Sequence, residues 1–153
     1  MEYVKLTNDL KMSRIVHGLW RLDQWNLSSR ELLRLIEETL DMGIDTFDHA
    51  DIYGDYTCET LFGEILGLKP GLRKRMQVIT KCGIKLLSEK FPKRRIKYYD
   101  TSYEHIVGSA EQSLKNLKTN YIDVLLIHRP DPLMDPEAVA RAFEKMSTDG
   151  KVL

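Results

Sequence analysis

The chain has 153 residues, of which 42% are hydrophobic and 30% charged. This is the size and composition of one globular domain with a buried core. Its 23 Lys and Arg residues balance its 23 Asp and Glu residues, so the charge gives no reason to expect nucleic acid or a membrane as partner. No apolar run approaches the roughly 18 residues of a membrane helix, and the start of the chain lacks a secretory signal pattern. The two cysteines form no metal or redox motif, so we expect a reduced, cytoplasmic setting.

The first part of the chain is predicted to alternate strands and helices. A Thr-Asn-Asp turn joins two short strands into a hairpin, and two strands of the main fold follow. Ser28 and Glu31 have the spacing of a capping box that opens a helix, and Gly43 stands where a left-handed helix stop belongs. A shorter helix is predicted over 59–66. The predicted strands are 3–6, 11–13, 14–20 and 44–47.

Two further strands are predicted in the second part of the chain. The third strand of the main fold covers 76–80, and the fourth covers 122–127. The fourth is almost continuously apolar, which is typical of a strand buried on both faces. Residues 84–100 between them are long and basic. We interpret this stretch as a solvated loop, although long loops also serve as lids or anion-binding loops.

The helices of the second part have recognisable beginnings. Thr101 and Glu104 have capping-box spacing, and Asp135 followed by proline is typical of a helix start. Gly150 ends that last helix, and residues 151–153 resemble the first residues of a fifth strand. Four strand–loop–helix repeats predict parallel strands joined by right-handed crossovers. Residues 1–153 are therefore expected to form one α/β domain, or part of one.

Four reactive side chains follow predicted strands in the same way. Asp48 comes just after the second strand, with Tyr53 a few residues beyond it, Lys81 follows the third, and His128 follows the fourth. Taken alone, each has an ordinary structural role as a turn acid, a packing aromatic, a surface lysine or a satisfied histidine. The carboxyl ends of parallel strands share one edge, however, and active sites form there. The four side chains are therefore predicted to meet.

At these positions the chain resembles the aldo-keto reductases, most closely the bacterial oxidoreductases with His-Arg-Pro-Asp after the fourth strand. The resemblance covers essentially the whole chain. The matching segments are Gly43–Gly54, Glu59 with Gly63, Ile79–Gly83, Asp123–Pro130 and Gly150–Val152.

The resemblance implies a (β/α)8 TIM barrel that reduces an aldehyde or ketone to an alcohol with NADPH. Tyr53 would donate the proton, Lys81 and Asp48 would support it, and His128 would orient the substrate carbonyl. The physical chemistry agrees, because a free phenol with a pKa of about 10 is a poor acid at neutral pH. A nearby ammonium stabilises the phenolate, and a neutral imidazole can donate a hydrogen bond to the same oxygen.

The cofactor must supply the hydride, since no side chain can. By resemblance, Trp20, Arg21 and Asp48 would line the nicotinamide end of the site. The sequence spans about the first four βα units plus an N-terminal hairpin, and we expect truncation at the start of the fifth strand. An open half-barrel exposes its inner face and two strand edges. We therefore expect self-association through the opening, or poor solubility.

Two alternatives remain. The chain could be a catalytically silent relative that acts as a binding or interaction protein. It could instead be a metal-dependent barrel hydrolase that uses Asp48, His49, Asp51 and His128, although such a site needs fixed ligand geometry. The His-x-His pair of many such barrels is missing after His17.

Overall fold

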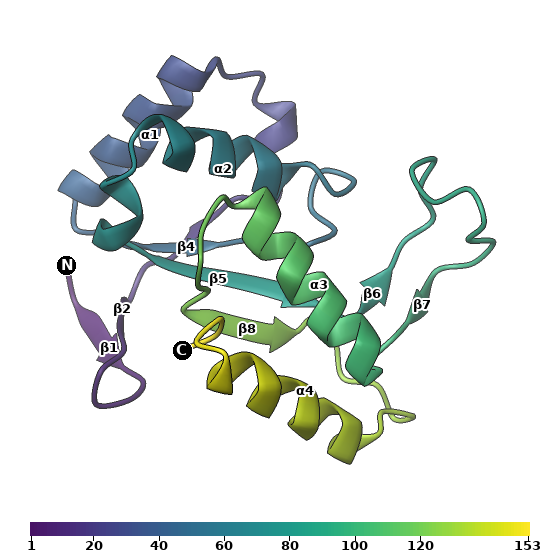
Figure 1. The fold of residues 1–153 in the computed structure, drawn as a ribbon. Helices are drawn as coiled ribbons and strands as arrows, with labels where there is room; N and C mark the ends of the chain where they lie inside the picture. Colours follow the sequence, from purple (N-terminus) through teal and green to yellow (C-terminus); the bar gives the residue numbers. More distant parts are fainter.

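The computed structural model describes residues 1–153 and centres on one parallel sheet. The sheet has the strand order β3–β4–β5–β8, so neighbours in space are also neighbours along the chain (Figure 1). This is the predicted βαβ arrangement. The first strand is shorter than predicted, because only two residues pair with β4. The strands are β3 (His17–Gly18), β4 (Thr46–Asp48), β5 (Gln77–Cys82) and β8 (Val124–Ile127).

Three of the four α-helices begin with side-chain caps, two of them as predicted, whereas α2 has none. The Ser28 hydroxyl accepts a hydrogen bond from the Glu31 N–H, and the Glu31 carboxylate accepts one from the Ser28 N–H, which confirms the capping box. The Asp135 carboxylate caps the last helix. The helices are α1 (Ser29–Asp41), α2 (Cys58–Leu68), α3 (Tyr103–Asn116) and α4 (Pro136–Thr148), with 3-10 turns η1 (Leu22–Gln24) and η2 (Leu72–Arg75).

The predicted capping box at Thr101 is wrong. The N-cap of α3 is Ser102, whose hydroxyl accepts from the His105 N–H. The Thr101 side chain is buried instead. The Asp100 carboxylate also accepts hydrogen bonds from the N–H and hydroxyl of Ser102, which fixes the cap one residue later.

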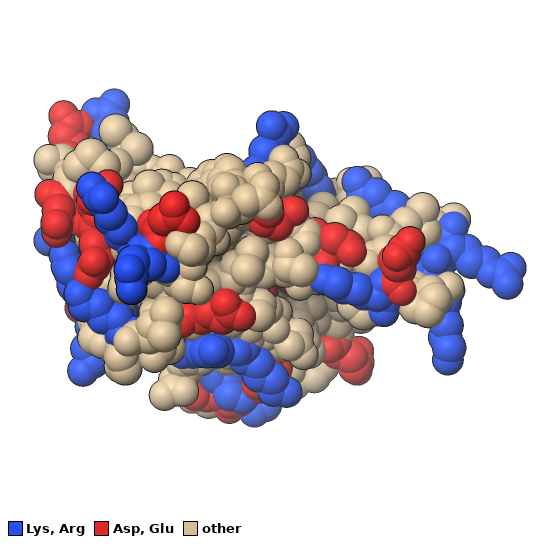
Figure 2. Space-filling view, turned by 90° about the horizontal axis from the view of Figure 1, so that it is seen from above, with Lys and Arg blue, Asp and Glu red and all other residues tan.

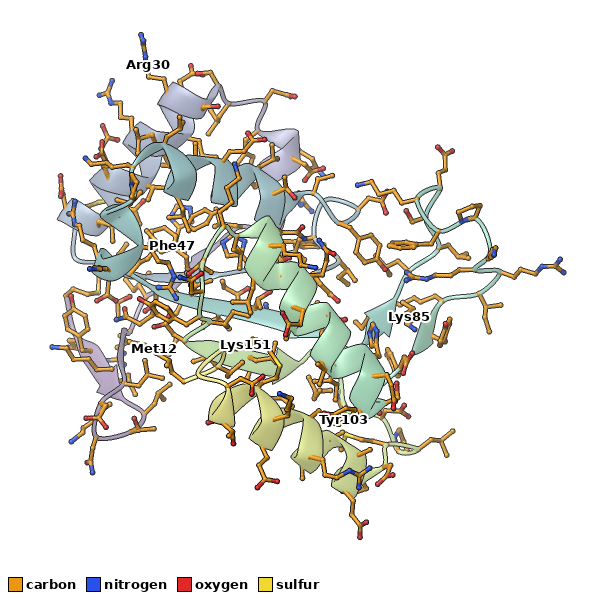
Figure 3. All side chains as sticks on the ribbon, in the orientation of Figure 1. Met12, Arg30, Phe47, Lys85, Tyr103 and Lys151 are labelled. Atoms are coloured by element: carbon orange, nitrogen blue, oxygen red, sulfur yellow. The ribbon has the colours of Figure 1, made fainter.

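Two apolar clusters hold the helices against the sheet. One lies between α1, α2 and the strands β4 and β5 and includes Phe47, which Figure 3 labels. The rings of Phe47 and Phe62 pack there with centroids 5.5 Å apart. The other lies between α3, α4, β5 and β8 and includes Ile106 and Met146. Helices α2 and α3 cross closely at Gly63, where an added Cβ would lie 2.0 Å from the Asn116 carbonyl oxygen. Glycine is required there because the backbones touch.

The N-terminal hairpin is confirmed. It consists of β1 (Tyr3–Lys5) and β2 (Lys11–Ser13), which pair antiparallel. Ser13 fixes it to the main sheet, because its N–H and hydroxyl bond to Asp45 and Thr46 at the start of β4.

The interpretation of residues 84–100 as a solvated loop holds for residues 86–97 but is wrong for the two ends of the stretch. Strands β6 (Ile84–Lys85) and β7 (Tyr98–Tyr99) pair antiparallel and form the base of a projecting arm (Figure 1). An ion pair between Lys85 and Asp100 closes this base. Lys and Arg side chains lie along the arm, at the right of Figure 2. Phe91 packs against Tyr56 with ring centroids 4.9 Å apart, which fixes the arm to the loop before α2.

Strand β8 is buried on one face, and the prediction of burial on both is wrong. Leu125 is 5% exposed beneath the helices, whereas Leu126 is 42% exposed on the opposite face. Successive residues of a strand point to opposite faces, and nothing in the structure covers the inner one at this point. Val152 forms a parallel bridge with Ile122, as a fifth strand would. None of the helices combines the length and hydropathy needed to cross a bilayer.

Candidate active site

The predicted site residues lie at one edge of the sheet, where the parallel strands end. Asp48 is the last residue of β4, and Lys81 lies one residue before the end of β5. His128 directly follows β8, and its N–H donates to the Cys82 carbonyl at 2.8 Å. Strand register therefore brings together side chains that are up to 80 positions apart in the sequence.

Lys81 is the centre of the cluster. Its Nζ donates to Asp48 Oδ2 at 2.7 Å, to the His49 carbonyl at 2.7 Å and to the Tyr53 hydroxyl at 3.0 Å. An ammonium has three N–H donors, so each finds one acceptor. The Lys81 and Asp48 side chains are 14% and 26% exposed. The ion pair is therefore largely shielded from water but remains accessible from the edge of the sheet.

Tyr53 reaches this edge because the chain reverses immediately after it. The Tyr53 N–H donates to the Ala50 carbonyl at 3.1 Å, and Gly54 adopts a φ of +57°. A Cβ at Gly54 would lie 2.6 Å from Cys58 Sγ, so glycine is required both for the turn and for the start of α2. The Tyr53 hydroxyl then lies 3.4 Å from Asp48 Oδ2, close to Lys81.

His128 lies edge-on to the Tyr53 ring, with centroids 5.8 Å apart. Burial, with the nearby charges of Lys81 and Arg129, lowers the pKa of His128 to about 4. The imidazole is therefore neutral at pH 7, so one ring nitrogen donates and the other accepts. It makes no hydrogen bond to Tyr53, and its buried Nδ1 has no partner within the chain.

The other two ionisable groups of this loop point away from the cluster. The His49 ring is fully buried against Phe62, with centroids 4.5 Å apart, and burial lowers its pKa to about 3. Burial raises the pKa of Asp51 to about 8, with a further contribution from Glu59. No group of three or more His, Cys, Asp or Glu side chains is placed to hold a metal ion. The geometry thus lacks the ligand set that the hydrolase alternative requires.

Trp20 and Arg21 lie at the same edge. The Leu19 N–H donates to the Asp48 carbonyl at 3.0 Å, which places the next residue, Trp20, beside the end of β4. The indole is 62% exposed, and the Arg21 guanidinium lies 5.0 Å from its centroid.

Two groups near the site were not among the predicted site residues, although Glu59 is one of the residues that match the family. The first is the His49 main-chain carbonyl, which no residue pattern reveals. The second is Glu59, which is 2% exposed and accepts hydrogen bonds from Thr80 at 2.6 Å and Asn116 at 3.2 Å. A signal for Glu59 existed, because it shares a helical face with the buried Phe62.

The model of the aldo/keto reductase family matches residues 14–153. The chain belongs to the aldo/keto reductase family. It is 60% identical over 152 residues to the uncharacterized oxidoreductase YcsN of Bacillus subtilis, covering 99% of this chain and 51% of that protein. It is 43% identical over 153 residues to the 6-dehydroglucose reductase of Agrobacterium fabrum, covering 99% and 52%.

Among solved structures, aldo-keto reductase AKR11C1 from Bacillus halodurans superposes with a TM-score of 0.81 at 25% identity. The match covers 99% of this chain and 48% of that one. The chain spans about half the length of these relatives. Its fold is that of the first βα units of a (β/α)8 barrel, as the sequence predicted.

Proposed function

We propose that these residues supply the proton-transfer part of an NADPH-dependent reductase that converts an aldehyde or ketone to an alcohol. The observation that carries the proposal is the hydrogen bond of the Lys81 ammonium to both the Tyr53 hydroxyl and the Asp48 carboxylate. A lysine used only for surface solvation would not be enclosed by three acceptors.

In this proposal Tyr53 donates its hydroxyl proton to the carbonyl oxygen of the substrate. The Lys81 ammonium, 3.0 Å away, stabilises the phenolate that forms. Asp48 holds the ammonium in position. His128 is neutral and borders Tyr53, so it donates a hydrogen bond to the same carbonyl oxygen and stabilises its developing charge.

The hydride comes from the nicotinamide when NADPH is bound. The exposed, flat Trp20 indole beside Asp48 fits a planar ring at this edge, and with Arg21 these residues would hold the nicotinamide end. Sugar aldehydes are the substrate class to test first, because two relatives, 43% and 37% identical, are 6-dehydroglucose reductases. The setting proposed for this chemistry is cytoplasmic.

Substitution Tyr53→Phe tests the proposal. It removes the proton and keeps the ring, so kcat should fall by on the order of 10²- to 10⁴-fold. NADPH binding, followed by its fluorescence, should change little. Tyr103→Phe is the matched control, because the Tyr103 side chain, on α3, packs against the apolar cluster that includes Ile106 and Met146 and makes no hydrogen bond to the site residues. It should keep full turnover.

Two results would contradict the proposal. Undiminished turnover in Tyr53→Phe would remove Tyr53 as the proton donor. If the wild-type protein leaves NADPH fluorescence unperturbed, the silent binding protein becomes the better description.

A further inference from the structure

Two cationic side chains border the candidate active site and have no acidic partner. Arg129 directly follows His128, and Lys97 directly precedes β7 at the base of the projecting arm. Both residues are exposed. Neither takes part in any ion pair of the chain. Their charges are therefore available to a ligand at this edge of the sheet.

The backbone brings the arm and the loop after β8 to the same point (Figure 1). The Asp100 N–H, just after β7, donates to the Gly83 carbonyl at 3.1 Å. The His128 N–H donates to the neighbouring Cys82 carbonyl at 2.8 Å. The base of the arm and the residues after β8 therefore meet at the end of β5, next to the imidazole.

The charges around the imidazole confirm that both cations lie close to it. Burial is the largest cause of the lowered pKa of His128, and Arg129 and Lys97 lower it further. Lys81 and Asp48 act on the same ring with opposite signs and neutralise each other as an ion pair. The two unpaired cations remain.

The nearest acids along the chain do not balance these two cations. Asp100, at the base of the arm, is paired with Lys85. Asp131, which follows the His-Arg-Pro segment, accepts the Leu133 N–H with Oδ1 and pairs with neither cation. This part of the edge therefore has positive charge that no side chain of the chain neutralises by direct contact.

We propose that the substrate carries an acidic group, a carboxylate or a phosphate, a short carbon chain away from its carbonyl, and that Arg129 and Lys97 bind this group. The proposal rests on the proposed function, in which Tyr53 and His128 hold the carbonyl. A guanidinium donates two parallel hydrogen bonds to a carboxylate or phosphate, and an ammonium adds a point charge. Unpaired positive charge also attracts anionic substrates to the site. Among sugar aldehydes, short acidic ones are therefore favoured over neutral ones.

Reduction of succinic semialdehyde and of butanal by the full chain with NADPH tests this proposal. The two aldehydes have the same four-carbon chain, and only the first carries a carboxylate. We expect kcat/KM to be about tenfold higher for succinic semialdehyde, chiefly through KM, as hydrogen bonds to a charged group would give. The preference should shrink as salt is added, because salt screens exposed charges. Equal kcat/KM for the two aldehydes would overturn the proposal and leave the proposed function intact.

Single variants locate the acidic group. Arg129→Gln and Lys97→Gln should each reduce the preference for succinic semialdehyde by about threefold or more. Lys93→Gln is the matched control, because it removes the same charge nearer the tip of the arm, and it should leave kcat/KM for both aldehydes unchanged. An equal loss of preference in all three variants would overturn the proposal, because the net charge of the chain would then set the preference.

Binding of 4-hydroxybutyrate, the product of succinic semialdehyde reduction, separates this proposal from the proposed function. Calorimetry measures this binding without turnover, and 1-butanol serves as the uncharged control. If neither aldehyde is reduced, the proposed function fails. Saturable binding of 4-hydroxybutyrate that Arg129→Gln weakens would still support the site for the acidic group, whereas the absence of saturable binding would overturn it as well.

Discussion

The two ends of the central sheet each carry an ion pair of nearly equal length, with different surroundings. At the N-terminal end, Arg73 contacts Asp123 at 2.6 Å, and the side chains are 9% and 7% exposed. At the C-terminal end, Lys81 contacts Asp48 at 2.7 Å, and the side chains are 14% and 26% exposed. The first pair is enclosed by the fold, whereas the second opens onto the edge where substrate would arrive.

The partners of each cation explain the difference. The Arg73 guanidinium also donates to the Met76 and Tyr121 carbonyls, and Asp123 Oδ2 also accepts from the Val78 N–H at 2.7 Å. These are mostly fixed main-chain groups, so the pair locks η2 to the starts of β5 and β8. Lys81 instead contacts two groups that can gain or lose a proton, Asp48 and Tyr53. One pair stabilises the fold, and the other has the contacts that the proposed proton transfer requires.

Substitution Arg73→Leu should have the largest effect on stability. It leaves Asp123 buried without its cation, and breaking such a pair costs about 3–5 kcal/mol. Urea unfolding measures the change. Arg75→Leu is the control, because Arg75 pairs with Asp41 at the surface, where the loss should be below about 1 kcal/mol. Equal losses in the two variants would remove the distinction between buried and exposed pairs.

Acidification should give the next largest effect, through His49 at the C-terminal end. The pKa of His49 is about 3 in the folded chain against 6.5 for a free histidine. Its contribution to stability is therefore fully present above pH 6.5 and is lost as the pH falls towards 3, at no more than about 1.4 kcal/mol per pH unit. The free energy of unfolding, measured from pH 7 to pH 4, should fall less steeply in His49→Leu. An unchanged slope would assign the acid sensitivity to other groups.

Substitution Lys81→Met should have the smallest effect on stability. Asp48 is 26% exposed and is hydrated when its partner is lost, so we expect a change of about 1 kcal/mol or less. Turnover should nevertheless fall strongly, because the Tyr53 phenolate that forms in the proposed reaction is no longer stabilised by the Lys81 ammonium. A loss of stability as large as that of Arg73→Leu would show that both ends serve the fold.

Much of the framework could be predicted from local patterns. The capping box of Ser28 and the Asp135 cap depend on contacts within four residues, so their sequence spacing is sufficient. The prediction of a cap at Thr101 was wrong because the position of this cap depends on contacts between distant parts of the chain. Asp100 and the β6–β7 base, which pairs distant parts of the chain, place Ser102 at the cap. The exposure of Leu126 also depends on what covers the sheet, which an apolar run does not reveal.

The sequence by itself determined that Asp48, Lys81 and His128 lie at one edge, because strand ends follow from the alternation of strands and helices. Only the tertiary structure decided which side chains of the loop after β4 point to Lys81 and which point away from it. The Asp48 and Tyr53 side chains accept hydrogen bonds from the Lys81 ammonium. The His49 main-chain carbonyl accepts another, while the His49 ring packs on Phe62. Asp51 lines a cavity between α2, α3 and the arm. Side-chain direction in an irregular loop depends on contacts with β5, α2 and α3, and these exist only once the chain has folded.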